Sequence, residues 1–150
     1  MEYLARLRTE GTRTLVDFPD CPGCQTIGKN RVEALRRARE ALEGWLEAHL
    51  VDGKAPPPPS PRPGRPGNRT ALIAISPVLS VRLELRWARQ GLGLSQEDLA
   101  KRIGVTRQQI ALLESPDSNV TLRTLERVAR AMDLQLDIRL TQAAEARYLR

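Results

Sequence analysis

The stretch from residue 94 to residue 114 reads LSQEDLAKRIGVTRQQIALLE, and it determines the fold expected for the second half of the chain. Ser95 is a typical N-cap residue, and Asp98, three residues later, is able to return a hydrogen bond to it as in a capping box. Gly104 is expected to end this helix, and Thr106 is expected to cap a second one. The expected buried side chains are Leu99, Ala100, Ile103, Ile110 and Leu113. Two short helices joined by a glycine-containing turn are typical of a helix-turn-helix.

The second of these helices would expose polar side chains at its N-terminal end, where a base edge or a phosphate can be reached. Arginine pairs with guanine and glutamine with adenine through two hydrogen bonds, and a helix N-terminus favours phosphate. The residues expected to read bases are Arg107, Gln108 and Gln109, and those expected to contact phosphates are Gln96, Lys101, Arg102 and Thr106. A helix-turn-helix dimer is expected to bind an inverted repeat whose half-sites lie about one helical turn apart, or a multiple of it.

This stretch resembles the helix-turn-helix of the Cro/C1-type (XRE) repressors. The matching elements are Ser95-Gln96-Glu97, Leu99-Ala100, Gly104-Val105 and Ile110-x-x-x-Glu114. The resemblance implies DNA binding, with Gln96 touching the DNA backbone and supporting the reading helix. A plain helical hairpin is the alternative interpretation of the same pattern.

Net charge is unevenly distributed along the 150 residues, which carry +6 in total. Residues 53–150 contain 16 Lys and Arg against 9 Asp and Glu, whereas residues 1–52 contain 8 against 9. A basic second half indicates either a polyanionic partner such as nucleic acid or simply a solvated surface. Two cysteines cannot form a disulfide scaffold, no apolar run approaches the roughly 18 residues that span a bilayer, and the N-terminus does not read as a secretory signal. A cytoplasmic protein is therefore expected, without a membrane partner.

Residues 53–68 read GKAPPPPSPRPGRPGN, with seven prolines and three glycines. Such a composition predicts an extended, semi-rigid connector. We expect it to separate a first unit, residues 1–76 with the connector at 53–69, from a second unit, residues 77–150. The apolar run at 70–75 is expected to be a strand that returns to the first unit, in which case the connector is a crossover loop.

The expected fold class is α+β. The first unit should form a small antiparallel sheet from strands near residues 3–8, 14–18 and 24–27, followed by a helix from 31 to about 50 that Asn30 caps. The second unit should be helical over 78–90, 95–104, 106–114 and 120–132. Alternating apolar residues then predict a half-buried C-terminal strand, formed by Leu134, Leu136, Ile138 and Leu140. We expect this strand to pair with its copy in a homodimer or higher homo-oligomer; the alternative is pairing with residues 70–75 of the same chain.

The first unit is similar to the HicB antitoxin family. The resemblance is carried by Tyr3, Val16-Asp17-Phe18-Pro19-Asp20, Pro22-Gly23-Cys24, Thr26, Gly28, Glu33-Ala34-Leu35, Ala41-Leu42-Glu43 and Trp45-Leu46. It implies a partial ribonuclease-H-like fold, a HicA-type mRNA-cleaving toxin as partner, and repression of the operon through its operator DNA. Because an RNA-cleaving toxin must be basic, the acidic loop Asp17, Phe18, Pro19 and Asp20 is the candidate toxin contact. The chain departs from the family pattern at Cys21 and in its proline-rich connector.

Other chemistries have weak support in the sequence. Cys21-Pro22-Gly23-Cys24 has redox spacing, but a strand and not a helix is expected after it, so a turn explains it better. Two cysteines and one histidine do not complete a structural zinc site, and Asp17 and Asp20 do not complete a nuclease centre. No catalytic residue, metal or cofactor is therefore expected, and the chain is not expected to be an enzyme. A stand-alone regulator with a ligand-sensing first unit and a ribonuclease-H-like hydrolase are the competing hypotheses.

Overall fold

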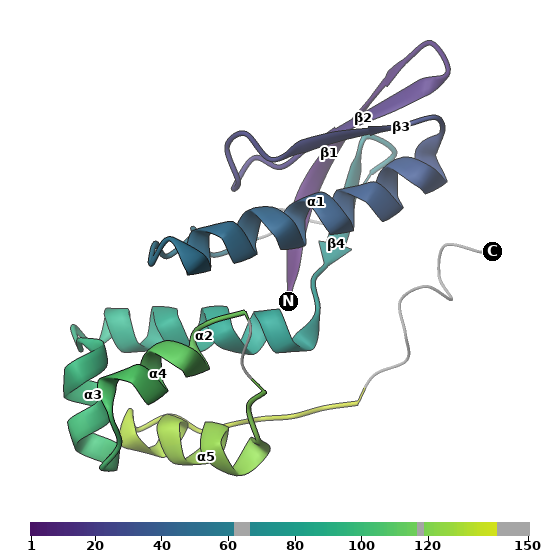
Figure 1. Cartoon of the computed structure of the whole chain (residues 1–150). Coiled ribbons are helices and arrows are strands. Elements are labelled where there is room, and N and C mark those ends of the chain that lie inside the picture. The colour runs from purple at the N-terminus through teal and green to yellow at the C-terminus, as the bar shows by residue number, and fades with distance from the viewer. Residues whose placement is uncertain (62–66, 117–118, 141–150) are drawn as a thin grey trace.

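The computed structural model describes residues 1–61, 67–116 and 119–140, and these form an α+β fold as expected. Four strands and the first helix precede a run of four helices (Figure 1). The elements are β1 (Glu2–Glu10), β2 (Arg13–Asp17), β3 (Gln25–Gly28), α1 (Arg31–Val51), β4 (Thr70–Ala74), α2 (Pro77–Gly91), α3 (Gln96–Ile103), α4 (Arg107–Leu113) and α5 (Leu122–Ala131).

The strands form one antiparallel sheet in the order β3-β2-β1-β4, with α1 across one face (Figure 1). β4 pairs with β1, so that Tyr3 lies opposite Ile73, which confirms the expected return of residues 70–75 to the sheet. Alternate residues of the strands point toward α1 and are buried with every fourth residue of the helix. The buried residues of α1 are Ala34, Ala38, Leu42, Leu46 and Leu50, whereas Leu35, Trp45 and His49 beside them are only partly buried.

The two short helices α3 and α4 are capped as the sequence predicts. The side chain of Ser95 accepts from the backbone of Asp98, whose carboxylate accepts in return, and Gly104 ends α3 with a φ of 68°. Positive φ favours glycine because it has no Cβ. A second core holds this unit together, made of Leu99, Ala100, Ile110, Val128 and Met132.

Helix α2 joins the two cores. Leu79 and Leu83 belong to the core under the sheet, whereas Leu85 and Ala88 pack against the second core. In Figure 1, α1 lies between the sheet and α2, and α3, α4 and α5 lie on the other side of α2. The two cores are thus built against a shared helix.

Over the part that the structure describes, up to residue 61, the proline-rich connector is packed against residues of the core under the sheet. Pro56 is fully buried; its carbonyl accepts a hydrogen bond from Trp87 Nε1 at 2.8 Å, and the carbonyl of Pro57 accepts one from the Tyr3 hydroxyl at 3.1 Å. The sequence predicted a spacer, but aromatic donors on β1 and α2 bind its carbonyls and make it part of the packing.

Residues 134–140 form no strand within the described chain. The alternative pairing with residues 70–75 is wrong, because β4 pairs with β1 and no further strand adjoins it among the described residues. A strand needs a hydrogen-bonded neighbour, so pairing between two copies stays a prediction.

Candidate nucleic-acid interface

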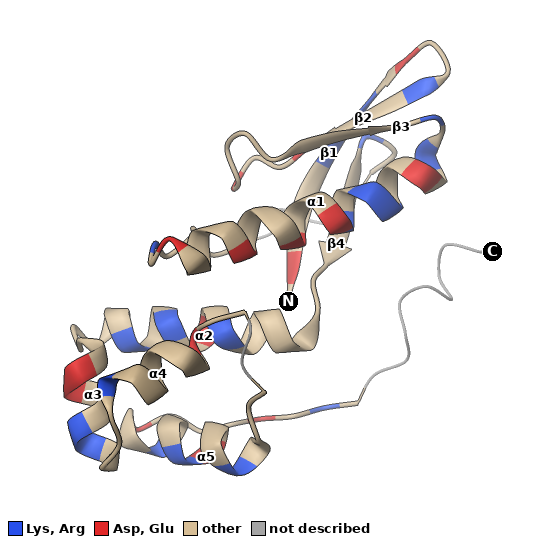
Figure 2. Cartoon of the chain, viewed as in Figure 1, with Lys and Arg blue, Asp and Glu red and all other residues tan. Residues whose placement is uncertain are grey.

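The N-terminal end of α4 borders an open hollow of about 570 Å³. Its lining residues are Glu97, Val105, Thr106, Arg107, Gln108 and Ala111. Arg107 and Gln108 are exposed on the first turn of the helix, the position from which a side chain reaches a base edge. Figure 2 shows further basic residues on α3 and α5 of the same unit. The hollow thus combines an open helix N-terminus with an arginine and a glutamine, both suited to base recognition.

The side chain of Gln109 is engaged differently from those of its two neighbours. Its Oε1 accepts a hydrogen bond from the backbone N–H of Thr106 at 2.9 Å, while Thr106 Oγ1 accepts from the backbone of Gln109. The pattern Thr-x-x-Gln is a capping box, a signal that the sequence itself carries. Only the amide nitrogen of Gln109 is left to donate to DNA, so the side chain has a structural role beside its expected role in reading.

Lys101 and Arg102, expected to contact phosphates, are exposed on the last turn of α3. Lys101 forms a loose ion pair with Glu97 at 3.6 Å, and Arg102 donates to the carbonyl of Ala131 at 3.4 Å. Both contacts lie at the surface, where the side chains can exchange them for phosphate oxygens at little cost.

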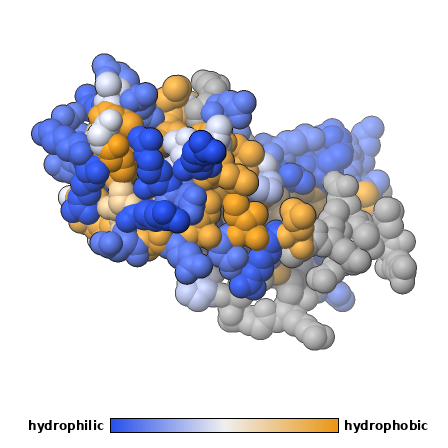
Figure 3. All heavy atoms as spheres, turned by 90° about the horizontal axis from the view of Figure 1, so that it is seen from below, coloured by the Kyte–Doolittle hydropathy of each residue, from blue (hydrophilic) through white to orange (hydrophobic). Residues whose placement is uncertain are grey.

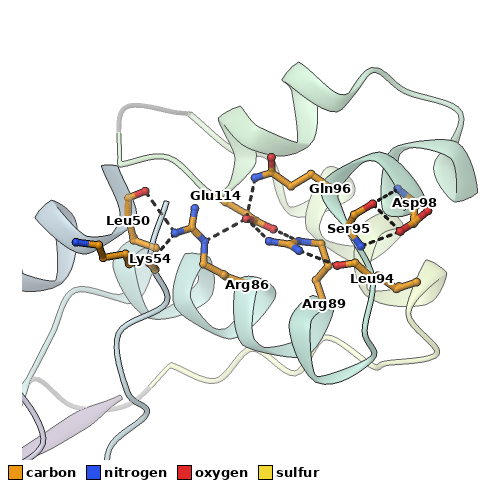
Figure 4. Close-up of polar contacts among 9 residues, drawn as sticks. All are labelled: Leu50, Lys54, Arg86, Arg89, Leu94, Ser95, Gln96, Asp98 and Glu114. Atoms are coloured by element: carbon orange, nitrogen blue, oxygen red, sulfur yellow. Dashed lines mark hydrogen bonds and ion pairs between the residues drawn. The ribbon is translucent and has the colours of Figure 1, made fainter. Parts of the chain in front are cut away.

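Gln96 is fixed by a buried carboxylate. Its Nε2 donates to Glu114 Oε2 at 3.1 Å, and Glu114, 2% exposed, also accepts from Arg86 Nε at 3.2 Å and from Arg89 Nε at 2.6 Å (Figure 4). Burial by itself would raise the pKa of Glu114, but the hydrogen bonds and charges of Arg89, Gln96 and Arg86 outweigh it and hold that pKa below its usual value. Gln96 is therefore held in place by an ionised group.

The roles of Arg86 and Arg89 in this cluster were missed from the sequence. Both lie on the same side of α2 as Arg82, at spacings of four and three residues, and all three are nearly buried. An arginine stripe at helical spacing is usually a solvated face. What distinguishes this stripe is the pairing of Arg86 and Arg89 with Glu114, which lies 28 residues after the first and 25 after the second. Sequence spacing alone does not reveal such a pairing.

The candidate toxin contact lies at the other end of the protein, after β2. Asp17 and Pro19 are partly exposed, and Asp17 forms an ion pair with Arg8 at 3.7 Å. Phe18 is buried in the core under the sheet, and the carboxylate of Asp20 accepts hydrogen bonds from the N–H and hydroxyl of Ser60 at 2.9 and 2.6 Å. The structure thus brings the loop together with the connector, and three of its four side chains, those of Asp17, Phe18 and Asp20, already have partners within the chain.

Cys21 and Cys24 are free and buried beside a tight turn. Burial raises the pKa of Cys21 to about 12 and that of Cys24 to about 11, so both thiols are protonated at neutral pH and unreactive. Within the described part of the chain, no three His, Cys, Asp or Glu residues converge in a way that could hold a metal ion. Nor does any helix in that part have the length and apolar character that crossing a membrane requires.

Comparison with known proteins gives matches to both parts of the chain. A family model described as a HicB-like antitoxin of bacterial toxin–antitoxin systems matches residues 6–106, and a model described as helix-turn-helix matches residues 85–138. "Antitoxin HicB 1" of Photorhabdus laumondii is 32% identical over 123 residues, covering 82% of this chain and 76% of that protein. "Antitoxin HicB" of Escherichia coli K12 is 25% identical over 124 residues, covering 83% and 87%. An uncharacterised HTH-type transcriptional regulator of Methanothermobacter thermautotrophicus is 46% identical over 52 residues, 35% of this chain and 75% of that protein.

Proposed function

The chain belongs to the HicB-like family of antitoxins of bacterial toxin–antitoxin systems, and from this we propose that it masks a HicA-type mRNA-cleaving toxin and represses its own operon. The toxin would bind the first unit, residues 1–76, and the operator DNA would bind the second, residues 77–150. One observation supports the proposal most strongly: the antitoxin match continues, in the same chain, into a capped helix-turn-helix with Arg107 and Gln108 exposed.

The DNA-binding half of the proposal is tested by substitutions at the reading end. Arg107→Ala should cost about 1–3 kcal/mol of binding free energy and relax the preference at one base pair of each half-site. Lys101→Ala should weaken all sequences about equally and reduce the salt dependence. Arg36→Ala is the matched control, because Arg36 is an exposed arginine on α1 that forms an ion pair with Glu40 of its own helix.

The measurement is fluorescence anisotropy at several salt concentrations, with DNA that the parent chain selects from a random-sequence pool. Gln109→Ala is less informative because it also removes the side-chain acceptor of the Thr106 backbone N–H, one half of the capping box, whereas Gln108→Ala does not. Arg107→Ala binding the selected DNA like the parent would exclude Arg107 from the reading surface.

The toxin-binding half is tested by co-expression with the small protein encoded beside this chain, followed by co-purification and a growth assay. Asp17→Lys and Asp20→Lys should weaken the complex, since a toxin that holds RNA is basic. Because Asp20 also holds Ser60, Ser60→Ala is the control: it removes the hydrogen bond from the Ser60 hydroxyl without reversing a charge, while the bond from the Ser60 backbone N–H stays. Charge reversals that leave toxin affinity unchanged would remove this loop from the interface.

We also propose that residues 134–140 pair with their copies in a homodimer, which would place two reading helices on an inverted repeat. The support is an extended segment with Leu134 44%, Ile138 54% and Leu140 100% exposed. The face seen in Figure 3, which includes α5, also exposes apolar side chains beside polar ones. An unpaired extended backbone with apolar side chains is a template for another strand.

Deleting residues 134–150 should give a monomer by light scattering. Ile138→Pro should do the same in the full chain, because proline cannot donate to a strand ladder. Dimers that persist in both variants would refute this assembly.

A further inference from the structure

The guanidinium group of Arg86 binds the first unit and the DNA-reading unit at once. Its Nη1 donates to the carbonyl of Lys54 at 2.8 Å and to that of Leu50 at 3.3 Å, while its Nε donates to Glu114 Oε2 at 3.2 Å (Figure 4). The side chain is only 6% exposed. Through these three hydrogen bonds, the single side chain of Arg86 connects the C-terminal end of α1 with the helix-turn-helix.

Each side of this contact has a physical reason. Leu50 lies in the last turn of α1, where a positive charge is favourable, and its carbonyl accepts from Arg86 in addition to the backbone N–H of Gly53 at 3.1 Å. Glu114 follows α4 directly and is buried, so its charge needs donors around it. Only a planar guanidinium presents donors in two directions at fixed geometry; an ammonium group at the end of a flexible chain does not.

Glu114 continues the contact toward the DNA-reading end, because the same Oε2 atom that accepts from Arg86 also accepts from Gln96 Nε2. Gln96 is the first residue of α3. The orientation of its amide therefore depends on where Glu114 is held. Arg89 holds Glu114 as well, but its remaining bond goes to the carbonyl of Leu94 inside the same unit. Arg86 is the arginine of this pair that reaches α1.

We propose that Arg86 is a positioning residue for DNA recognition: it anchors Glu114, and through it Gln96, to the C-terminal end of α1. The first unit then supports the DNA-reading end directly, beyond its role as the toxin-binding unit. This inference rests on the DNA binding proposed above and deepens it, since it gives the first unit a part in DNA affinity.

Arg86→Lys is the informative substitution, because it keeps a positive charge beside Glu114 but loses the planar fork. We expect it to weaken binding to the selected DNA by about three- to tenfold, the effect of one lost or misplaced hydrogen bond per half-site. Trp87→Phe is the matched control on the next residue: it removes the bond from Nε1 to Pro56, also made across the two units, but does not touch Glu114. Affinity within twofold of the parent is expected for Trp87→Phe.

A double-mutant cycle separates positioning from general destabilisation. If Arg86 acts through Gln96, Arg86→Lys should have no further effect on DNA affinity in a Gln96→Ala background. Additive losses would overturn the proposal, and so would parent-like affinity of Arg86→Lys or an equal loss in Trp87→Phe. Should Arg86→Lys not fold, Arg86→Gln in the same cycle gives the same comparison.

A second measurement needs no DNA. The chain has three lysines, Lys29, Lys54 and Lys101, and a lysine-specific protease cuts after each. The carbonyl that Arg86 binds is that of the Lys54–Ala55 peptide bond. Arg86→Gln, which adds no new lysine, should speed cleavage after Lys54 several-fold and leave cleavage after Lys29 and Lys101 unchanged, as followed by mass spectrometry. Unchanged cleavage after Lys54 would overturn the anchoring of α1. If the parent chain selects no DNA, the proposed DNA binding and the role of Arg86 in it are both refuted. The rate of cleavage after Lys54 would still show whether Arg86 anchors α1 to the second unit.

Discussion

Replacing Glu114 by glutamine removes one negative charge from between two buried arginines. The carboxylate is 2% exposed, and the side chains of Arg86 and Arg89 are 6% and 8% exposed, so water cannot take over its role. Glutamine keeps one carbonyl oxygen, but its NH₂ group would face N–H donors on at least one side. The variant therefore leaves an excess of buried positive charge and loses an acceptor.

The expected loss of stability follows from this geometry. Removing one partner of a buried pair costs about 3–5 kcal/mol, because the remaining charge stays buried without compensation. For a chain of 150 residues, each kcal/mol lowers the melting temperature by about 2–4 °C. A decrease of roughly 10 °C is therefore expected at neutral pH.

Thermal unfolding followed by circular dichroism measures this decrease. Glu126→Gln is the control, because Glu126 forms an ion pair of the same chemistry with Arg130 at 2.6 Å but is 53% exposed. Its melting temperature should stay within about 2 °C of the parent, as is usual for exposed pairs. If Glu114→Gln melted as close to the parent as this control, the buried cluster would not contribute to folding stability as argued here.

Three further predictions concern acid stability and substitutions at three glycines. The pKa of Glu114 in the folded chain lies below its ordinary value of 4.5, so the ionised carboxylate contributes stability that is fully present above pH 4.5 and is lost as pH falls through the folded pKa. Below about pH 4.5 the melting temperature should therefore fall more steeply for the parent than for Glu114→Gln. Parallel slopes of melting temperature against pH would contradict this. Gly28→Ala would place a Cβ 2.3 Å from the backbone nitrogen of Ala34 in α1, so urea unfolding should show a loss of about 1–3 kcal/mol or more, and an unchanged midpoint would disprove the close approach. Gly104→Ala should lower the free energy of unfolding by about 1–2 kcal/mol, because the φ of residue 104 is +68°. Gly44→Ala, where the added Cβ lies in open space within α1, should raise it by up to about 1 kcal/mol. The reverse ranking of the two variants would be incompatible with the backbone described.

The features that the sequence predicts correctly depend on short spacings. The capping box of Ser95 and Asp98, the turn at Gly104 and the N-cap at Asn30 each involve residues within a few positions of one another. The return of β4 to the sheet follows from its apolar pattern together with the small size of the first unit. Local patterns of this kind predict structure without any knowledge of the contacts between distant residues.

Most of the features that were missed depend on contacts between distant residues, whereas the burial of Phe18 and the capping box of Thr106 and Gln109 are local. Arg86 and Glu114 are 28 positions apart, and Asp20 and Ser60 are 40 positions apart, so neither pairing can be derived from periodicity. Phe18 was expected in the toxin contact because it lies between two acids, but strand alternation with Val16 turns it into the core. The sequence predicts the caps and turn of the helix-turn-helix well because they lie in one local motif, whereas the surface proposed to bind a toxin has no such motif.

The hydrogen bonds of the proline-rich connector bear on how such a chain can be recombined during evolution or by design. Prolines offer only carbonyl acceptors, and here those of Pro56 and Pro57 are matched to the indole of Trp87 and the phenol of Tyr3. A different DNA-reading unit joined at this point would have to bring its own donor for Pro56, or leave that buried carbonyl unsatisfied. A glycine–serine connector of equal length would span the same distance, but its backbone would have more conformational freedom in the unfolded chain than the prolines allow. The connector therefore restricts which two units can be joined, because the donors on both units have to match its carbonyl groups.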